Sequence, residues 1–154
     1  MKNKHSFFIE IAEKISEQST CCRLKVGCIL VNDGRIISIG YNGSPSNTEH
    51  CENHFSKEDM KDYSAFRKNH HEWSDMHELH AETNAILFAA KEGISTKNSI
   101  LYVTDSPCIH CAKIIVSAGI KQVIYKNKYD NCTYGIDFLK NCGIKCDSLK
   151  ELIK

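Results

Sequence analysis

Two short segments of the sequence carry residue types that bind metals and move protons. The first is His80-Ala81-Glu82, and the second contains Cys108 and Cys111 in a Cys-x-x-Cys arrangement directly after Pro107. A Cys-x-x-Cys pair at a helix start places two thiols on one side of the first turn, where the helix N-terminus favours the thiolates that zinc binds. One imidazole and two thiolates leave the fourth tetrahedral position for water. The pattern therefore predicts a catalytic zinc held by His80, Cys108 and Cys111.

Glu82 is the candidate for the group that moves protons beside this zinc. Zinc lowers the pKa of a bound water from about 15.7 to roughly 7, and a neighbouring carboxylate can take the proton and pass it to a substrate. Residues two apart on a helix point about 200° apart, so His80 and Glu82 share one site only where the helix begins. An Asp75-x-x-Glu78 capping box would start the helix five residues earlier. We predict the later start.

The elements that must position these segments alternate between helix and strand. Asn32-Asp33-Gly34 between two β-type runs predicts a hairpin. The order α-β-β-α-β-α-β-α-β predicts an α/β fold with three α/β/α layers and one mixed sheet. Apolar periodicity predicts helices over 7–18, about 76–91, 108–118 and 136–141, and strands over 26–31, 36–39, 100–104, 123–126 and 144–146.

Length, composition and charge favour one intracellular domain that acts on a small molecule. The 154 residues, 42% of them hydrophobic, suit one domain over 1–154. Residues 43–74 are polar and aperiodic, which predicts a long irregular loop of the functional or metal-held kind. The net charge of +1 provides no large field for a nucleic-acid backbone. Nine cysteines, an odd number, with no export signal or membrane-spanning segment predict reduced thiols and a cytoplasmic protein, in the host cytoplasm if it is viral.

The chain resembles the deoxycytidylate (dCMP) deaminases of the cytidine deaminase superfamily, whose signature is H-x-E followed by P-C-x-x-C. The resemblance runs through CCRLKVGCILVNDGRIISIGYNGSP, HAETNAILFAA and LYVTDSPCIHCAKIIVSAGIKQVIY. It implies the cytidine-deaminase-like fold with a five-stranded mixed sheet, commonly assembled as a hexamer. It also implies zinc-dependent hydrolysis of dCMP to dUMP with release of ammonia, a step that feeds thymidylate synthesis.

The resemblance also implies substrate contacts. Asn42 would contact the deoxyribose or phosphate, and Lys25 and Tyr129 match positions that hold the 5′-phosphate, with Arg23 nearby. A cation, an amide and a phenol suit phosphate and sugar oxygens. The simpler alternatives are a solvated charge at Lys25 and a surface aromatic at Tyr129.

A second, structural zinc is implied at Cys21, Cys51, His70 and Glu78. Such a metal would explain how residues 43–74 stay ordered. The family is further associated with regulation by dCTP and dTTP, but Lys91 stands where it often has arginine, and lysine cannot bind phosphate bidentately. By residue type alone, other second-zinc ligands are equally eligible, namely Cys22, His50, His54, His71 and His77.

Several alternatives stay open at this point. Within the superfamily, the enzyme could act also on dCTP, or on free cytidine or tRNA adenosine. A tRNA enzyme should have a more basic face, and a nucleoside enzyme needs no phosphate ligands. Outside catalysis, the motif could belong to a zinc-stabilised interaction module, a zinc ribbon or finger, or a core histidine near unrelated cysteines. Such a protein would be indifferent to loss of Glu82.

Overall fold

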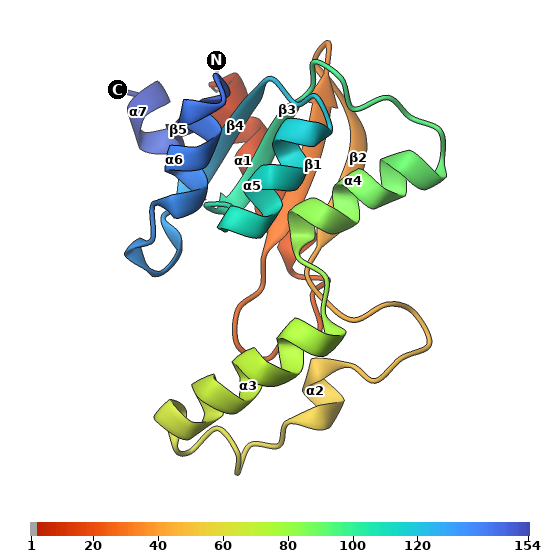
Figure 1. Cartoon of the computed structure of the whole chain (residues 1–154), viewed down its shortest axis with the longest axis vertical. Helices are drawn as coiled ribbons and strands as arrows, with labels where there is room; N and C mark the ends of the chain where they lie inside the picture. The colour runs from red at the N-terminus through yellow and green to blue at the C-terminus, as the bar shows by residue number, and fades with distance from the viewer. Residues whose placement is uncertain (1–2) are drawn as a thin grey trace.

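The computed structural model describes residues 3–154 as a five-stranded mixed sheet with helices on both faces (Figure 1). The strand order is β2-β1-β3-β4-β5. The β1–β2 and β1–β3 pairs are antiparallel, and the β3–β4 and β4–β5 pairs are parallel. The predicted hairpin and the predicted mixed sheet are therefore confirmed. The strands are β1 (Gly27–Asn32), β2 (Arg35–Tyr41), β3 (Ile100–Asp105), β4 (Gln122–Asn127) and β5 (Lys145–Ser148).

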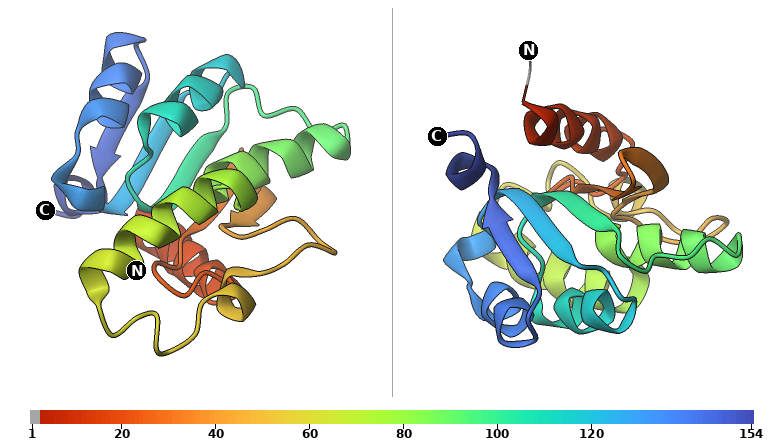
Figure 2. Two further views of the ribbon diagram at one scale, coloured as in Figure 1. Left: turned by 60° about the horizontal axis from the view of Figure 1, so that its bottom comes forward. Right: turned by 90° about the horizontal axis from the view of Figure 1, so that it is seen from above.

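The helices form the two outer layers. One face of the sheet is covered by α1 (Lys4–Ser16) and the short α7 (Leu149–Leu152). The other face is covered by α4 (Ala81–Lys91), α5 (Ile109–Ser117) and α6 (Tyr134–Asn141). Figure 2, seen from above, shows these layers on opposite sides of the sheet, which confirms the three-layer prediction. None of the helices in residues 3–154 is long and apolar enough to cross a membrane.

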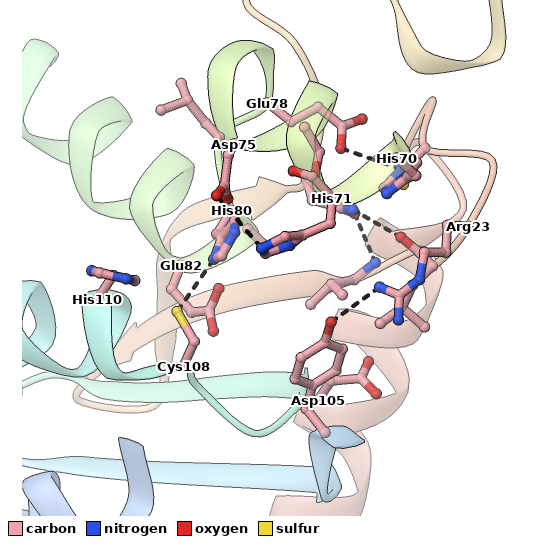
Figure 3. A pocket seen from close by; sticks show the side chains of 18 of the residues that line it. Arg23, His70, His71, Asp75, Glu78, His80, Glu82, Asp105, Cys108 and His110 are labelled. Atoms are coloured by element: carbon pink, nitrogen blue, oxygen red, sulfur yellow. Dashed lines mark hydrogen bonds and ion pairs between the residues drawn. The ribbon is translucent and has the colours of Figure 1, made fainter. Parts of the chain in front are cut away.

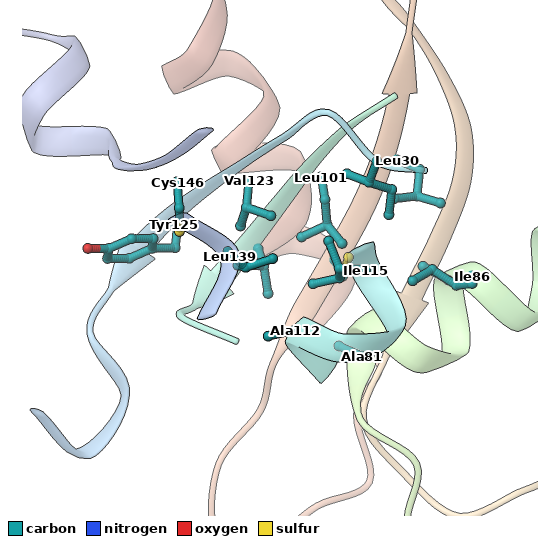
Figure 4. Packing of buried hydrophobic residues seen from close by; sticks show 14 of the residues in the cluster. Leu30, Ala81, Ile86, Leu101, Ala112, Ile115, Val123, Tyr125, Leu139 and Cys146 are labelled. Atoms are coloured by element: carbon teal, nitrogen blue, oxygen red, sulfur yellow. The ribbon is translucent and has the colours of Figure 1, made fainter. Parts of the chain in front are cut away.

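The larger core lies between the sheet and helices α4, α5 and α6. Leu101 and Val123 are paired across β3 and β4 and are fully buried. They meet Ile115 of α5 and Leu139 of α6 in one apolar cluster (Figure 4). The parallel strands are buried on both faces, which accounts for their almost uninterrupted apolar sequences. This core holds the starts of α4 and α5 against the sheet.

The prediction of an irregular loop over 43–74 needs correction. This stretch contains α2 (Cys51–His54) and most of α3 (Tyr63–His77), which project beyond one end of the sheet (Figure 1). Asp62 caps α3 through a hydrogen bond from the Ala65 backbone N–H. The buried face of α3 is Phe66, His70 and Trp73, a helical spacing that is hidden when histidine is counted as polar.

Candidate functional site

The candidate site lies where the carboxyl ends of β2, β3 and β4 meet the start of β1. These strand directions follow from the pairing, so the segments that leave three strands open onto one end of the sheet. In α/β sheets this end is where ligands bind. A cavity of about 320 Å³ is present there, and its lining includes Arg23, Asn42, Glu82, Cys108 and Tyr129.

The His80–Glu82 segment occupies the very start of α4, as the later of the two predicted helix starts requires. His80 is the N-cap residue with extended backbone angles, and its carbonyl accepts the first helical hydrogen bond, from the Asn84 N–H. Because the chain is still turning into the helix, the imidazole and the Glu82 carboxylate both face the cavity (Figure 3). Asp75 lies inside α3 and Glu78 ends it, so the earlier start does not occur.

The two cysteines begin α5 in the same way. Cys108 is the N-cap residue, and its sulfur accepts a hydrogen bond from the Cys111 backbone N–H at 3.5 Å. The Thr83 hydroxyl lies 3.7 Å from the Cys111 sulfur and can donate to it. Both sulfurs therefore lie at a helix N-terminus, where negative charge is stabilised.

The geometry of these three side chains fits a tetrahedral zinc ion. The Nδ1 atom of His80 is 3.5 Å from the Cys108 sulfur and 3.3 Å from the Cys111 sulfur. Ligand bonds of about 2.0–2.3 Å at tetrahedral angles place nitrogen and sulfur ligands roughly 3.5 Å apart. The sequence-predicted ligand atoms are thus brought together, with the cavity on their open side.

Burial and the nearby thiols tune the charges in this site. Glu82 is only 5% exposed, and burial raises the pKa of its carboxyl to about 7. The hydrogen bond to Cys108 raises the pKa of His80 to about 9. Hydrogen bonds from Cys111 and His80 hold the pKa of the Cys108 thiol far below its usual range. Because zinc binds neutral imidazole and thiolates, metal binding must release protons here.

Two glycines allow the close approach of the elements that carry the site. A Cβ atom at Gly40 of β2 would overlap the backbone of Ala81, the residue between His80 and Glu82. A Cβ atom at Gly135 of α6 would overlap the carbonyl oxygen of Pro107, next to Cys108. Only glycine fits these contacts, although neither was singled out by the sequence pattern.

A second cluster lies against the same cavity, between α3 and the segment before β1. The Cys21 sulfur is 3.3 Å from Nε2 of His70, which is 3.9 Å from a Glu78 oxygen. The other Glu78 oxygen is buried without a hydrogen-bond partner, as an unfilled metal ligand would be. Together with Cys51, these side chains offer four ligand atoms within 4.8 Å of one another. Of the other ligands that residue type allows, none belongs to this group. Four are histidines, namely His50, His54, His71 and His77, and the fifth is Cys22, whose sulfur is 3.1 Å from that of Cys51.

Of the two cations named from the sequence, Arg23 lines the cavity and Lys25 does not. Lys25 is exposed and is absent from the cavity lining. Arg23 lines the cavity instead and donates a hydrogen bond to the Tyr129 hydroxyl at 3.0 Å. Its Nε atom is buried without a partner.

Asn42 lines the cavity with both polar side-chain atoms engaged. Its oxygen accepts from the Val26 N–H and its nitrogen donates to the Leu24 carbonyl, both at 2.8 Å. The side chain therefore clamps the segment that presents Arg23. Its oxygen retains a lone pair for a substrate hydroxyl, so the sugar contact stays a prediction.

Three residues in or next to this cavity escaped the sequence reasoning: Asp105, which lines it, and Arg67 and Asp130, which lie beside it. Asp105 ends β3 at the cavity, and burial raises the pKa of its carboxyl while the Thr104 hydroxyl donates to it at 2.8 Å. Arg67 of α3 and Asp130 form an ion pair beside Tyr129. A charged residue directly after a strand was the available signal for Asp105. Nothing local in the sequence links Arg67 to Asp130.

A family model, the curated relatives and the solved structures all place the chain in one family. Residues 2–127 match the family described as "Cytidine and deoxycytidylate deaminase zinc-binding region". The chain is similar to the deoxycytidylate deaminase of Enterobacteria phage T2, with 38% identity covering 97% of this chain and 94% of that one. It is also similar to the crystal structure of dCMP deaminase from the cyanophage S-TIM5 in complex with dCMP and dUMP, with 34% identity, a TM-score of 0.76, and coverage of 97% and 99% of the two chains.

Proposed function

Because the chain belongs to the cytidine and deoxycytidylate deaminase family, we propose that it hydrolyses dCMP to dUMP and ammonia, a step that feeds thymidylate synthesis. The observation that carries this proposal is one cavity with two chemically different ends. The candidate zinc ligands and the buried Glu82 lie on one side, and Arg23, hydrogen-bonded to Tyr129, lies on the other (Figure 3). This arrangement suits a pyrimidine base joined through a sugar to a phosphate.

Glu82 carries the protons of the proposed reaction. When bound, zinc lowers the pKa of water and so supplies a nucleophile at neutral pH. Glu82, with a pKa near neutrality, takes a proton from the attacking water while the oxygen of that water bonds to C4 of the base. The carboxyl then passes this proton to the ring nitrogen N3. Glu82 then takes the second proton from the new C4 hydroxyl and delivers it to the amino group, so that the C4 carbonyl forms, the C4–N4 bond breaks and ammonia leaves.

The proposed phosphate site consists of Arg23 and Tyr129. Arg23 is held by Tyr129, and its side chain is only 16% exposed, so it loses little freedom when it binds an anion. A partly buried guanidinium with an unpartnered Nε donor is well suited to a phosphate oxygen. Lys25, the sequence-based candidate, would have to reach the same phosphate from outside the cavity.

Arg23→Gln is expected to raise the KM for dCMP by about tenfold or more, with a smaller change in kcat. A hydrogen bond to a charged group contributes about 1.5–3 kcal/mol, and this bond would be lost in the ground and transition states alike. Turnover of deoxycytidine, which has no phosphate, should not change. Steady-state ammonia release checks both substrates. If Lys25→Gln raised the KM and Arg23→Gln did not, the phosphate would lie on Lys25.

A substrate panel tests the proposed function as a whole. Purified zinc-loaded enzyme would be given dCMP, dCTP, deoxycytidine and an adenosine-bearing RNA hairpin, each followed by ammonia release. We expect dCMP to have the highest kcat/KM. Turnover of the nucleoside without a response to dCMP would refute the proposal. Turnover of none of the four by fully metallated protein would favour a zinc-stabilised interaction module.

The second cluster is proposed to hold a structural zinc on Cys21, Cys51, His70 and Glu78. The four side chains join the segment before β1 to α2 and α3, and the buried Glu78 oxygen needs a partner. Glu78 and His80 belong to one short link, in which Leu79 is bridged to Gly43. A metal in this cluster would thereby steady the catalytic ligand His80.

Cys51→Ser is expected to lower the zinc content from two ions per chain to one. Serine offers no thiolate, so the second cluster would lose an anionic ligand while the His80 site stays complete. Elemental analysis of purified protein checks the content. Cys22→Ser is the matched control, because Cys22 is adjacent but lies outside the group of four, and it should keep two zinc ions. One zinc in the unaltered protein would contradict the second site.

We also propose a cytoplasmic homo-oligomer, a hexamer as the family resemblance implies. Apolar side chains are exposed on the edge strand β2, at Ile36, Ile39 and Tyr41, and on α4, at Leu87 and Phe88. Such groups favour association between copies. All nine cysteines are free thiols, in keeping with a reducing compartment. Effector control by dCTP and dTTP is part of the same proposal, with Lys91 exposed at the end of α4.

A further inference from the structure

Beside the proposed phosphate site lies a second cavity of about 580 Å³, which we call the outer cavity. Arg23 lines both cavities and therefore stands at their boundary. The outer cavity also contains two further permanent cations, Arg67 and Lys68 of α3, and Asp130, the only carboxylate among its described lining residues. A nucleotide whose first phosphate lies on Arg23 would direct any further phosphates into this space.

Asp130 occupies the cations that a longer phosphate chain would need. Its carboxylate is 2.6 Å from an Arg67 nitrogen and 3.8 Å from an Arg23 nitrogen. The Arg67 and Asp130 side chains are 50% and 41% exposed, whereas Arg23 is 16% exposed, so the carboxylate stands on the outward side of Arg23. The residue has a left-handed backbone, with φ of 46°, in the short turn that also carries Tyr129.

Charge rather than space therefore limits the number of phosphates that a ligand can place at this boundary. The outer cavity has room for additional phosphates, but a β-phosphate would meet the Asp130 carboxylate and would have to separate it from Arg67. A monophosphate requires neither. Arg23, Arg67 and Lys68 against one carboxylate leave an excess of two positive charges, which matches a phosphate monoester dianion.

We infer that Asp130 is a specificity-determining residue that restricts this site to nucleoside monophosphates by neutralising Arg67 and repelling a β-phosphate. This inference rests on the proposed function. It concerns the length of the phosphate chain rather than the reaction, so the two can fail separately. Repulsion of the wrong ligand by an unpaired like charge is a general source of specificity.

The test is the ratio of kcat/KM for dCTP to kcat/KM for dCMP. Asp130→Asn keeps the shape of the side chain and tolerates a left-handed backbone, and it removes the charge. We expect the ratio to rise about tenfold, equivalent to about 1.4 kcal/mol. Asp33→Asn is the matched control: it is the same change at a left-handed position, φ 48°, in the distant β1–β2 turn, and should leave the ratio unchanged.

A double variant identifies the cation that is released. Asp130→Asn combined with Arg67→Gln should lose most of the gain, because no freed guanidinium remains for the β-phosphate. An unchanged or lower ratio in Asp130→Asn, with dCMP still turned over, would overturn the inference and leave the proposed function intact. A gain that persists in the double variant would overturn the role of Arg67.

Binding provides a readout that does not depend on turnover. Affinities for dCMP and dCTP can be measured by calorimetry on zinc-loaded Glu82→Gln protein with and without Asp130→Asn. The affinity for dCTP relative to dCMP should rise by the same factor. If the unaltered enzyme deaminated no cytidine nucleotide, the proposed function would fail. The inference would be rejected separately if Glu82→Gln protein had the same ratio of dCTP to dCMP affinity with and without Asp130→Asn.

Discussion

Glu82→Gln is expected to lower kcat for dCMP by at least about a thousandfold without loss of zinc. General acid–base catalysis contributes roughly 10²–10⁴-fold, and in the proposed mechanism Glu82 serves both as the base for water and as the acid for the ring and the leaving amine. Glutamine fills the same buried space and cannot carry the proton. Glu82 is outside the three-ligand set, so the metal should stay.

The measurement pairs ammonia release with metal analysis of the same preparation. Glu92→Gln, at the exposed C-terminal end of the same helix, is the matched control and should keep full activity. A fully active Glu82→Gln enzyme would show that another group moves the protons. Loss of zinc together with activity would instead make Glu82 a structural residue.

Cys108→Ser is expected to remove both the catalytic zinc and all measurable turnover. The Cys108 thiol ionises readily because Cys111 and His80 hydrogen-bond to it, whereas a serine hydroxyl stays protonated at neutral pH. The remaining imidazole and single thiolate form an incomplete site. The variant should therefore contain one zinc ion fewer per chain than the unaltered protein.

Chelation and re-addition of zinc separate loss of metal from damage to the fold. The unaltered enzyme should lose activity in chelator and regain it with Zn²⁺, and Cys108→Ser should not respond. Cys142→Ser, at an exposed cysteine after α6, is the control and should behave as the unaltered enzyme does. A Cys108→Ser protein with full zinc content would contradict the assigned ligand set.

The candidate catalytic residues and their local geometry could be predicted from the sequence because they depend on neighbours along the chain. His80 and Glu82 can share a site only at a helix start, and α4 begins at Ala81. Cys108 caps α5, as a Cys-x-x-Cys pair at a helix N-terminus should. The β1–β2 hairpin followed in the same way from the Asp-Gly turn.

The helices within residues 43–74 were missed because the buried face of α3 is only partly apolar, with a histidine between two aromatic residues. α3 buries Phe66, His70 and Trp73, and His70 is buried because it faces Cys21 and Glu78 from distant parts of the chain. A periodicity count that treats histidine as polar finds no face there. The segment acquires its buried side only through tertiary contacts.

The sequence alone thus predicted the candidate zinc ligands, the candidate proton carrier and the α/β/α order, since each follows from local helix starts, turns and strand patterns. Tertiary structure decided which of the two neighbouring cations lines the cavity. Arg23 rather than Lys25 lines the cavity, because Asn42 clamps the chain at Leu24 and Val26 and Tyr129 holds the guanidinium. The Arg67–Asp130 pair joins α3 to the turn after β4. No short-range pattern encodes such a contact, because its energy depends on two segments that meet only in the folded protein.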